Sequence, residues 1–289
     1  MSNKTTILID GLGFPEGPRW HDGRLWFSDF RQRRVSAVDL AGNIEVILEI
    51  DDQPSGLGWL PDGTLLVVSM INKALLSYKN NVVNTVADLS ELASHWCNDM
   101  VVDSRGYAYI GNFGAPLQTP AAKLAEVLFV KPNGSAQIVA TDMAFPNGAV
   151  ITADERTLIV AETYAARLTA FTIEADGTLS NRRTWAQFDD LGVVRDRKQL
   201  RNRVLPDGIC LDEQGAIWIA SPNSNREVIR VIEGGEIVDR ITVETFPYAC
   251  MLGGEDRKTL FILTSDLAQE GNIGKIETIR VNTPGAGFP

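Results

Sequence analysis

Residues 14–29 read FPEGPRWHDGRLWFSD, and this order of features returns five more times along the 289-residue chain. Each copy opens with a short phrase that carries a variable polar side chain, then an apolar stretch, a tight turn and a second apolar stretch. The variable positions, which we call the slot residues, are Glu16, Ser55, Asn98, Asn147, Asp207 and Tyr248. A fixed frame with one variable position predicts a ring of equivalent strands that point different side chains toward one centre.

Each slot is followed by the pattern of a β-hairpin. Turns such as Asp22-Gly23, Asp62-Gly63 and Arg105-Gly106 contain glycines that supply the positive φ of hairpin turns. The second apolar stretches, for example 65–68 and 217–220, are rich in β-branched, aromatic and other apolar residues. This composition is typical of strands that are buried on both faces.

Two further strands are predicted in most copies, at 34–40 and 44–50 in the first and at 167–173 and 183–188 in the fourth. Successive slots are 39, 43, 49, 60 and 41 residues apart. Four antiparallel strands in each of six such units predict an all-β protein, a six-bladed β-propeller that takes up residues 1–289 as one domain.

The two ends of the chain are expected to close this ring. The strand predicted at 5–10 precedes the first slot and belongs to no unit of its own, so we expect it to complete the sixth blade beside 275–281. Helical periodicity is nearly absent, and only 121–128 could form a short turn or helix.

Composition narrows the class of function. A net charge of −10 argues against nucleic acid or an anionic membrane as a partner. We expect no membrane span, because no run of about 20 apolar residues occurs, and no secretory signal. Three cysteines without metal-type spacing, Cys97, Cys210 and Cys250, predict buried free thiols in a reducing compartment, and therefore a cytoplasmic protein.

Four of the slot residues offer oxygen ligands. Two carboxylates (Glu16 and Asp207) and two carboxamides (Asn98 and Asn147) suit one hard divalent cation. Ca²⁺ is the first choice, although oxygen donors also admit Mg²⁺, Mn²⁺ or Zn²⁺. The alternative is that these side chains hydrogen-bond the backbone of neighbouring blades.

The second strand of each blade should return to the face where the slots lie. Polar residues stand there at matched positions: Asp29, Ser69, Asn112, Glu162, Ser221 and Thr264. We expect most of them to bind loop backbone and Asn112 to contact substrate. His95 precedes the slot residue Asn98 by three positions and either orients substrate, shuttles a proton or is simply exposed. Two insertions, 112–123 and 189–203, are pocket covers or plain surface loops.

Four phrases together resemble one known family, the senescence marker protein/gluconolactonase/luciferin-regenerating enzyme (regucalcin-like) family: FPEGPRW from residue 14, CND from 97, FPNG from 145 and PDG from 206. The resemblance runs from about residue 7 to residue 282. It implies a six-bladed propeller and metal-dependent lactonase activity, while other members are related to organophosphate hydrolases. It also implies that Glu16, Asn147 and Asp207 are metal ligands, with Asn98 as a fourth ligand or a substrate contact.

This sequence departs from the family pattern at Trp96. Sugar-lactone hydrolysing members often carry an arginine there, and its absence removes a cationic hydrogen-bonding fork. Trp96 and the slot residue Tyr248, with Met70, Phe113 and Phe145, would instead form an apolar, aromatic pocket. We therefore expect the substrate to be a small lactone or ester that is less polar than a sugar lactone.

The leading hypothesis is hydrolysis of a lactone at a divalent cation, with Asp207 as general base and Asn98 placing a substrate oxygen. One alternative is phosphotriester hydrolysis at the same ion. A second alternative, from another class, is a non-catalytic binding propeller in which the ion only holds the centre rigid.

Overall fold

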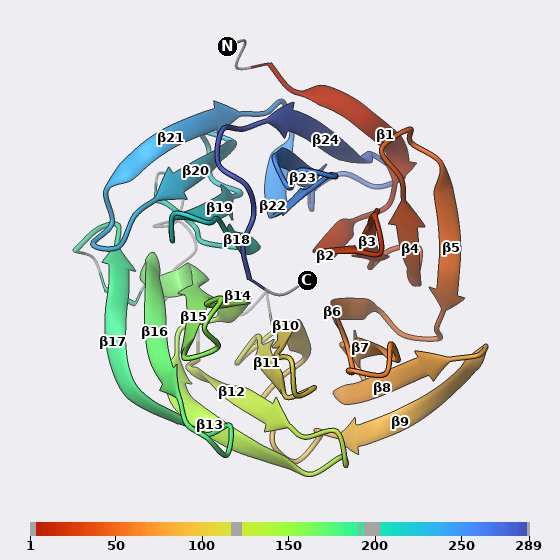
Figure 1. Cartoon of the computed structure of the whole chain (residues 1–289), viewed down its shortest axis with the longest axis vertical. Coiled ribbons are helices and arrows are strands. Elements are labelled where there is room, and N and C mark those ends of the chain that lie inside the picture. The colour runs from red at the N-terminus through yellow and green to blue at the C-terminus, as the bar shows by residue number, and fades with distance from the viewer. Residues whose placement is uncertain (1–3, 117–122, 191, 194–202, 288–289) are drawn as a thin grey trace.

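The fold is all-β. The computed structural model describes residues 4–116, 123–190, 192–193 and 203–287, and in this part of the chain the strands form six four-stranded antiparallel sheets. The sheets stand as blades around a common axis (Figure 1). The predicted six-bladed β-propeller is therefore confirmed.

Five blades follow chain order from the innermost strand outward. Blade one is β2 (Pro15–His21), β3 (Arg24–Asp29), β4 (Arg34–Val38) and β5 (Ile44–Glu49); blade two is β6 (Pro54–Trp59), β7 (Leu65–Ser69), β8 (Ala74–Lys79) and β9 (Val82–Asp88); blade three is β10 (Cys97–Val102), β11 (Ala108–Asn112), β12 (Ala125–Val130) and β13 (Ala136–Met143). Blade four is β14 (Pro146–Ile151), β15 (Thr157–Glu162), β16 (Arg167–Ile173) and β17 (Leu179–Gln187), and blade five is β18 (Ile209–Leu211), β19 (Ile217–Ser221), β20 (Glu227–Val231) and β21 (Ile237–Thr242).

The sixth blade joins the two ends of the chain. It consists of β22 (Phe246–Gly253), β23 (Thr259–Ser265), β24 (Gly274–Arg280) and, as the outermost strand, β1 (Thr6–Leu12). The prediction that the first strand closes this blade is confirmed, and that strand pairs antiparallel with β24. Pairing between the ends leaves β24 without a free edge at the seam.

Burial follows distance from the axis. Every residue of β7, β10 and β19 is buried, whereas the outer strands β5, β9 and β13 are exposed or partly buried except for one buried residue in each. The apolar second strands therefore supply the packing between blades, as their composition predicts. All three cysteines are buried free thiols, as expected.

The innermost strands of neighbouring blades lie unusually close together. A Cβ atom at Gly56 would stand 2.3 Å from the backbone nitrogen of Met100, and one at Gly208 would stand 2.5 Å from Cβ of Ala249. In the second case the strands also bond, since the N–H of Gly208 donates to the carbonyl of Tyr248 at 2.8 Å. Only glycine permits this approach, which brings the slots of different blades together.

The chain end covers one mouth of the central channel. The last described residues run from β24 across the ring toward its centre (Figure 1). The N–H of Ala286 donates to the carbonyl of Leu211 at 2.9 Å, and that of Gly285 donates to the carbonyl of Arg257 at 2.8 Å. Leu211 ends its innermost strand, so this segment lies at the end of the channel opposite the slots.

The structure describes the expected helix at 121–128 and the two predicted pocket covers only in part. The short helix expected at 121–128 is wrong where the structure describes it, because Ala125–Val130 is strand β12, held between β11 and β13. Residues 121–122 lie outside the described residues, as do 117–120 of the first insertion and 191 and 194–202 of the second, so the pocket covers remain predictions.

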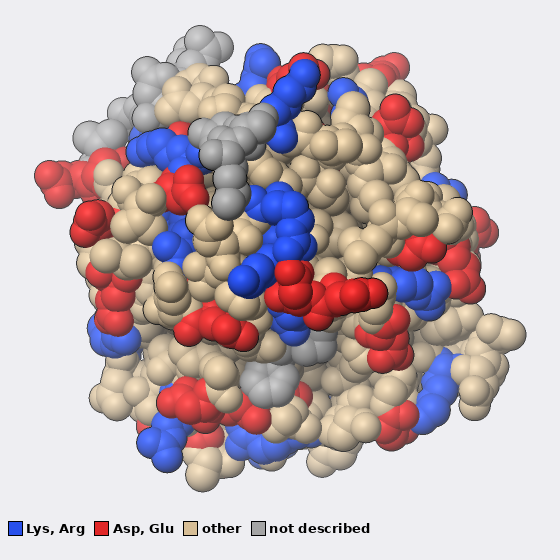
Figure 2. Space-filling model, turned by 45° about the horizontal axis from the view of Figure 1, so that its top comes forward, with Lys and Arg blue, Asp and Glu red and all other residues tan. Residues whose placement is uncertain are grey.

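The surface is mixed in charge, and no described helix is long and apolar enough to cross a membrane. On the face drawn in Figure 2, Lys and Arg side chains lie among Asp and Glu rather than gathered into one basic area. Nucleic acid requires a concentrated basic surface, and this face does not provide one.

Closure of the ring can be tested within β1. Leu12 is 2% exposed and packs in the core shared by the first and last blades, whereas Ile7 of the same strand is 49% exposed. We expect Leu12→Ala to lower the free energy of unfolding by about 3 kcal/mol, because it leaves a cavity at the seam. Urea denaturation measures this loss.

Ile7→Ala is the matched control and should change the free energy of unfolding by less than about 0.5 kcal/mol. Equal effects of the two substitutions would show that packing at the seam contributes nothing special to stability.

Candidate functional site

The slot residues lie at the beginning of the innermost strands. Glu16, Ser55, Asn98 and Asn147 are each the second residue of their strand, and Tyr248 is the third of β22. Asp207 is the exception, because it precedes β18 by two residues.

A β-bulge lies at the slot in five blades: it directly follows Glu16 and it contains Ser55, Asn98, Asn147 and Tyr248. In blade four, for example, Pro146 pairs with Glu162 but Ala149 pairs with Val160, so β14 advances three residues while β15 advances two. A bulge turns the side chains beside it out of the regular alternation of a strand. The repeated bulge explains why a polar slot and the apolar residues after it can share one strand.

Five of the six slot residues meet at one cavity. The cavity measures about 210 Å³ and also borders the aromatic side chains described below. Its slot residues are Glu16, Asn98, Asn147, Asp207 and Tyr248, while Ser55 is absent from the lining. Residues as far apart in the chain as Glu16 and Asp207 thus face the same space.

Hydrogen bonds connect these side chains to one another. Nδ2 of Asn98 donates to Oδ1 of Asn147 at 3.1 Å, and Oε2 of Glu16 accepts from the N–H of its neighbour Gly17 at 2.8 Å. None of the described hydrogen bonds of Glu16, Asn98 and Asn147 goes to the backbone of another blade. The alternative role of these slots, bonding to neighbouring backbones, is not what the structure supports.

The two carboxylates are buried close to further negative charge. Burial, followed by the charge of Asp99, raises the pKa of Glu16 to about 8. Burial, followed by the charges of Glu16 and Asp99, raises the pKa of Asp207 well above its ordinary value. The nearest compensating group is the guanidinium of Arg19, whose Nη2 lies 3.8 Å from Oδ1 of Asp99.

This electrostatic environment fits a divalent cation. Carboxylates that repel one another in a buried place are stabilised by a positive ion between them. Among the described residues no three His, Cys, Asp or Glu side chains gather into a metal-binding group, so carboxamide oxygens would have to complete the ligand set. A set of carboxylate and amide oxygens suits a hard cation such as Ca²⁺.

Six aromatic side chains and one methionine, which we call the aromatic wall, line most of the rest of the cavity: Phe14, Phe30, Met70, Trp96, Phe113, Phe145 and Tyr248. Arg31, Gln53 and Leu267 complete the lining. Ring centroids lie 4.6 Å apart for Phe14 and Tyr248 and 4.8 Å apart for Phe113 and Phe145. Trp96 stands edge-on to Phe113 at 6.2 Å. Polar oxygens thus form one part of the cavity and packed rings form the other.

Comparison with known proteins agrees with this arrangement. The family model described as the SMP-30/Gluconolactonase/LRE-like region matches residues 14–266. The chain belongs to this family. A 6-deoxy-6-sulfogluconolactonase from Pseudomonas putida is 25% identical over 285 residues, which cover 95% of this chain and 93% of that protein. A regucalcin from Gallus gallus is 21% identical over 264 residues, covering 86% of this chain and 82% of that protein.

The fold of this member of the SMP-30/gluconolactonase/LRE-like family also matches solved structures. A regucalcin from Agrobacterium tumefaciens, described as a calcium-binding protein, superimposes with a TM-score of 0.81 at 20% identity, covering 99% of this chain and 96% of the other. At this level of identity the likeness demonstrates a shared fold.

Sequence reasoning missed Asp99. This buried carboxylate raises the pKa of both Glu16 and Asp207, and burial raises its own pKa as well. A signal was present, because Asp99 follows a slot at the position where four other copies carry glycine: Gly17, Gly56, Gly148 and Gly208. A charged residue at a position otherwise reserved for close backbone contact indicates a special role.

Two predicted substrate contacts lie outside the cavity lining. Asn112 is completely buried, and its amide donates to the carbonyl and to Oε2 of Glu126, both at 3.0 Å, and accepts from the N–H of Gly114 at 2.9 Å. Because these bonds use its polar atoms, Asn112 holds the loop rather than facing a ligand. His95 lies behind Trp96, with ring centroids 5.1 Å apart. Burial lowers the pKa of His95.

Several of the polar residues that end the second strands bind loop backbone, as expected. Asp29 accepts from the N–H of Gly13 and Phe14 at 2.8 and 3.0 Å, and Ser221 accepts from the N–H of Leu205 at 2.9 Å. In each case the loop held in this way leads directly into a slot. These residues therefore position the slots from behind.

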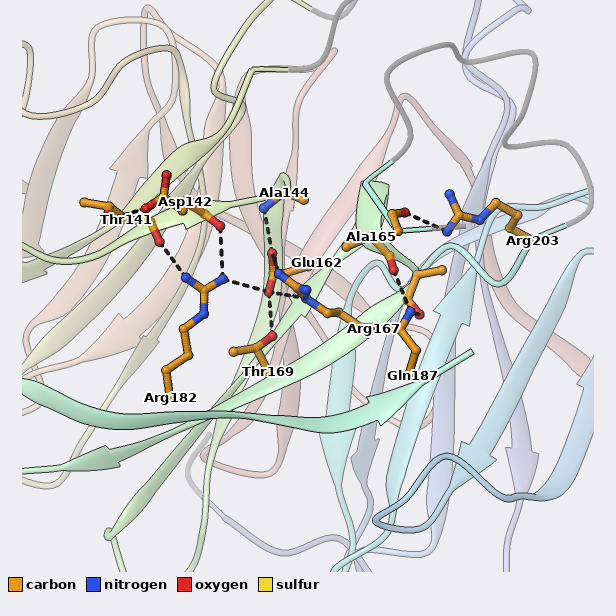
Figure 3. A network of polar contacts seen from close by, with 12 residues as sticks. Thr141, Asp142, Ala144, Glu162, Ala165, Arg167, Thr169, Arg182, Gln187 and Arg203 are labelled. Carbon is orange, nitrogen blue, oxygen red and sulfur yellow. Dashed lines mark hydrogen bonds and ion pairs between the residues drawn. The ribbon is translucent and has the colours of Figure 1, made fainter. Parts of the chain in front are cut away.

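Glu162 is the most elaborate of these supports (Figure 3). It accepts from the N–H of Ala144 at 2.7 Å, from Nε of Arg167 at 2.8 Å and from the hydroxyl of Thr169. Burial alone would raise the pKa of Glu162, but these hydrogen bonds and the charge of Arg167 hold it below the ordinary value of 4.5. The ionised carboxylate is thus the form that the fold stabilises.

Replacing Glu162 by Gln should destabilise the protein in a pH-dependent way. At pH 7 we expect a loss of about 2 kcal/mol, because a buried charged acceptor is removed. Since the folded-state pKa is lowered, the ionised group stabilises the fold above about pH 4.5 and this contribution disappears as the pH falls through the folded-state pKa. The difference between wild type and Glu162→Gln should therefore shrink on acidification in denaturation experiments.

Glu45→Gln is a suitable control, because Glu45 pairs with Arg24 at the surface with 63% of its side chain exposed. Its effect at pH 7 should be several times smaller, since exposed ion pairs contribute little. A difference for Glu162→Gln that stays constant down to pH 3 would contradict the role of the charge.

Proposed function

We propose that this protein is a divalent-cation-dependent lactonase that opens a cyclic ester to the hydroxy acid. The observation that carries the proposal is the meeting of two carboxylates and two carboxamides at one cavity on the propeller axis. The family description includes gluconolactonase, and the relative from Pseudomonas putida is named as a lactonase. The calcium-binding regucalcin of the same fold supports Ca²⁺ as the ion.

In this proposal Glu16, Asn147 and Asp207 hold the cation, and Asn98 is either a fourth ligand or the group that places a substrate oxygen. The bound cation would supply Lewis-acid polarisation of the ester carbonyl. Relief of the repulsion between Glu16 and Asp207 gives the protein a reason to bind it, because both carboxylates are otherwise ionised only at a cost.

Asp207 is the proposed general base. Its carboxylate takes one proton from a water molecule as the water oxygen bonds to the ester carbonyl carbon. The bond from that carbon to the ring oxygen then breaks, and the ring oxygen receives the proton to become the hydroxyl of the product. Water and lactone are thereby converted into one hydroxy acid, and Asp207 is ionised again.

Two further residues of the cavity lining, Tyr248 and Trp96, would orient the substrate. Burial, followed by the charge of Asp207, raises the pKa of Tyr248, so its hydroxyl stays protonated and can donate a hydrogen bond to an ester oxygen. Trp96 offers a flat apolar surface on the other part of the lining. Such a surface favours a hydrocarbon or aryl substituent over a chain of hydroxyl groups, which would lose hydrogen bonds to water on binding.

Removal of the base gives the first functional test. We expect Asp207→Ala to lower kcat for an aryl or aliphatic lactone by at least about 1,000-fold, because the general base and a cation ligand disappear together. The propeller should remain folded, as judged by circular dichroism. Hydrolysis is measured with CaCl₂ present and again after chelation.

Ser55→Ala is the matched control, because Ser55 occupies an equivalent slot outside the cavity lining and should leave kcat within about threefold of wild type. Turnover by Asp207→Ala at the wild-type rate would refute the assigned role. Thermal stabilisation by Ca²⁺ without hydrolysis of any lactone in a broad panel would favour the non-catalytic binding propeller. Faster turnover of phosphotriesters than of lactones would favour a phosphotriester hydrolase.

Substrate polarity gives the second test. We define the substrate preference as kcat/KM for an aryl lactone divided by kcat/KM for gluconolactone. We expect Trp96→Arg to lower this preference by at least about tenfold. The guanidinium would offer hydrogen bonds to hydroxyl groups, while an apolar surface for the ring would be lost. Steady-state kinetics on both substrates with wild type and variant measure the ratio.

Trp96→Phe keeps an apolar surface and should preserve the wild-type order of substrates. A wild-type enzyme that already prefers gluconolactone would contradict the proposed substrate class while leaving the lactonase proposal intact.

A further inference from the structure

We propose that Thr163 is a positioning residue that fixes the direction of the Asn147 carboxamide and thereby determines which of its atoms faces the cation. This inference rests on the cation site of the proposed function. Thr163 follows β15 directly, begins the short 3₁₀ helix η1 (Thr163–Ala165) and is 5% exposed. It does not line the cavity.

The hydroxyl of Thr163 can donate in only one direction. Its Oγ1 lies 2.7 Å from the carbonyl oxygen of Pro206, in the next blade. Two oxygens at this distance need a proton between them, and a carbonyl has none to give. The single hydroxyl proton of Thr163 is therefore committed to Pro206, and its oxygen can only accept from other neighbours.

This commitment orients Asn147. Its side-chain amide lies 3.2 Å from Oγ1 of Thr163, and the partner there must be the donor Nδ2 rather than Oδ1. Oδ1 of Asn147 consequently points the other way, where it accepts from Asn98 at 3.1 Å.

The direction has a chemical consequence. A carboxamide can bind a hard cation through its oxygen but repels it through its NH₂ group. With Thr163 acting only as an acceptor, the arrangement with NH₂ toward the cation would place two oxygens, of Asn147 and Thr163, against each other without a proton. One hydroxyl therefore selects the ligand-competent rotamer of Asn147.

The backbone around Thr163 is held as firmly as its side chain. The N–H of Thr163 donates to the carbonyl of Phe145 at 3.2 Å, and the N–H of Tyr164 donates to the carbonyl of Ala144 at 3.1 Å. Phe145 has a φ of 60°, a left-handed conformation that a bulky residue adopts only when its surroundings enforce it. Thr163 thus joins the segment that carries Asn147 to Pro206, which directly precedes Asp207.

Substitution of the hydroxyl tests this role. Thr163→Val keeps the shape but removes both the donor and the acceptor, whereas Thr163→Ser keeps both. We expect isothermal titration of the full chain with CaCl₂ to give a Kd at least about tenfold higher for Thr163→Val than for wild type, a typical effect of losing a group that orients a ligand. Thr163→Ser should bind within about threefold of wild type.

Thr259→Val separates positioning from stability. Thr259 is also buried, and its hydroxyl accepts from Nη1 of Arg280 at 3.0 Å, but it lies at the end of β23 away from Thr264 and the slot of its blade. It should lower the melting temperature without changing the Kd for Ca²⁺. An unchanged Kd for Thr163→Val, with wild type binding Ca²⁺, would overturn the role of Thr163 and leave the proposed function standing.

Crystal structures of calcium-free wild type and Thr163→Val give a readout that does not depend on the ion. A carboxamide of Asn147 that has turned about χ2 in the variant would support the inference. An unchanged rotamer that still accepts a hydrogen bond from Asn98 would overturn it. Failure of wild type to bind Ca²⁺ would refute the cation site itself, and the rotamer comparison would still decide whether Thr163 orients Asn147.

Discussion

The close approach of the innermost strands around the axis is the constraint on which the rest of the structure depends. Where Gly148 and Gly208 follow their slots, neighbouring blades bond backbone to backbone, at 3.2 Å to the carbonyl of Asp207 and 2.8 Å to that of Tyr248. Any larger residue would force the blades apart. Because the ring is this tight, side chains from blades far apart in sequence reach one cavity without long or flexible arms, which keeps their geometry defined.

The close approach of the innermost strands also brings buried negative charges together. Glu16, Asp99 and Asp207 lie buried near one another, and the charge of Arg19 lowers the pKa values of Glu16 and Asp99 only in part against the effect of burial. A core chosen only for stability would contain apolar residues at these positions. Three polar residues that end second strands, Asp29, Glu162 and Ser221, hold the loops that lead into the slots through hydrogen bonds to loop backbone. Hydrogen bonds from the ends of the second strands therefore stabilise the positions of buried carboxylates that repel one another when no cation is bound.

The sequence allowed the architecture to be predicted because the repeat is expressed locally. Turn glycines, apolar second strands and the slot phrase all fall at matched positions, and the closing role of the first strand follows from counting. The four oxygen donors could be predicted for the same reason. Asn112 could not be placed correctly, because its partner Glu126 belongs to the next strand and lies beyond an insertion. The role proposed for Thr163 could not be predicted either. It depends on a hydrogen bond to Pro206, which is 43 residues away, and on the direction in which that hydrogen bond is donated.

The cavity combines two environments that strengthen each other. Packed rings such as Phe113, Phe145 and Trp96 keep water away from the oxygen donors, and charge interactions grow stronger where water is excluded. In the proposed function the same rings would favour a less polar substituent, because ring faces offer few hydrogen bonds to hydroxyl groups and Arg31 and Gln53 are the polar side chains beside the slot residues in the lining. Reactivity toward the ester group and selectivity for a less polar substituent would therefore have one physical origin. Changing the wall to accept a sugar lactone would also admit water beside the carboxylates, so a change in specificity at Trp96 should be accompanied by weaker electrostatic stabilisation of the reaction.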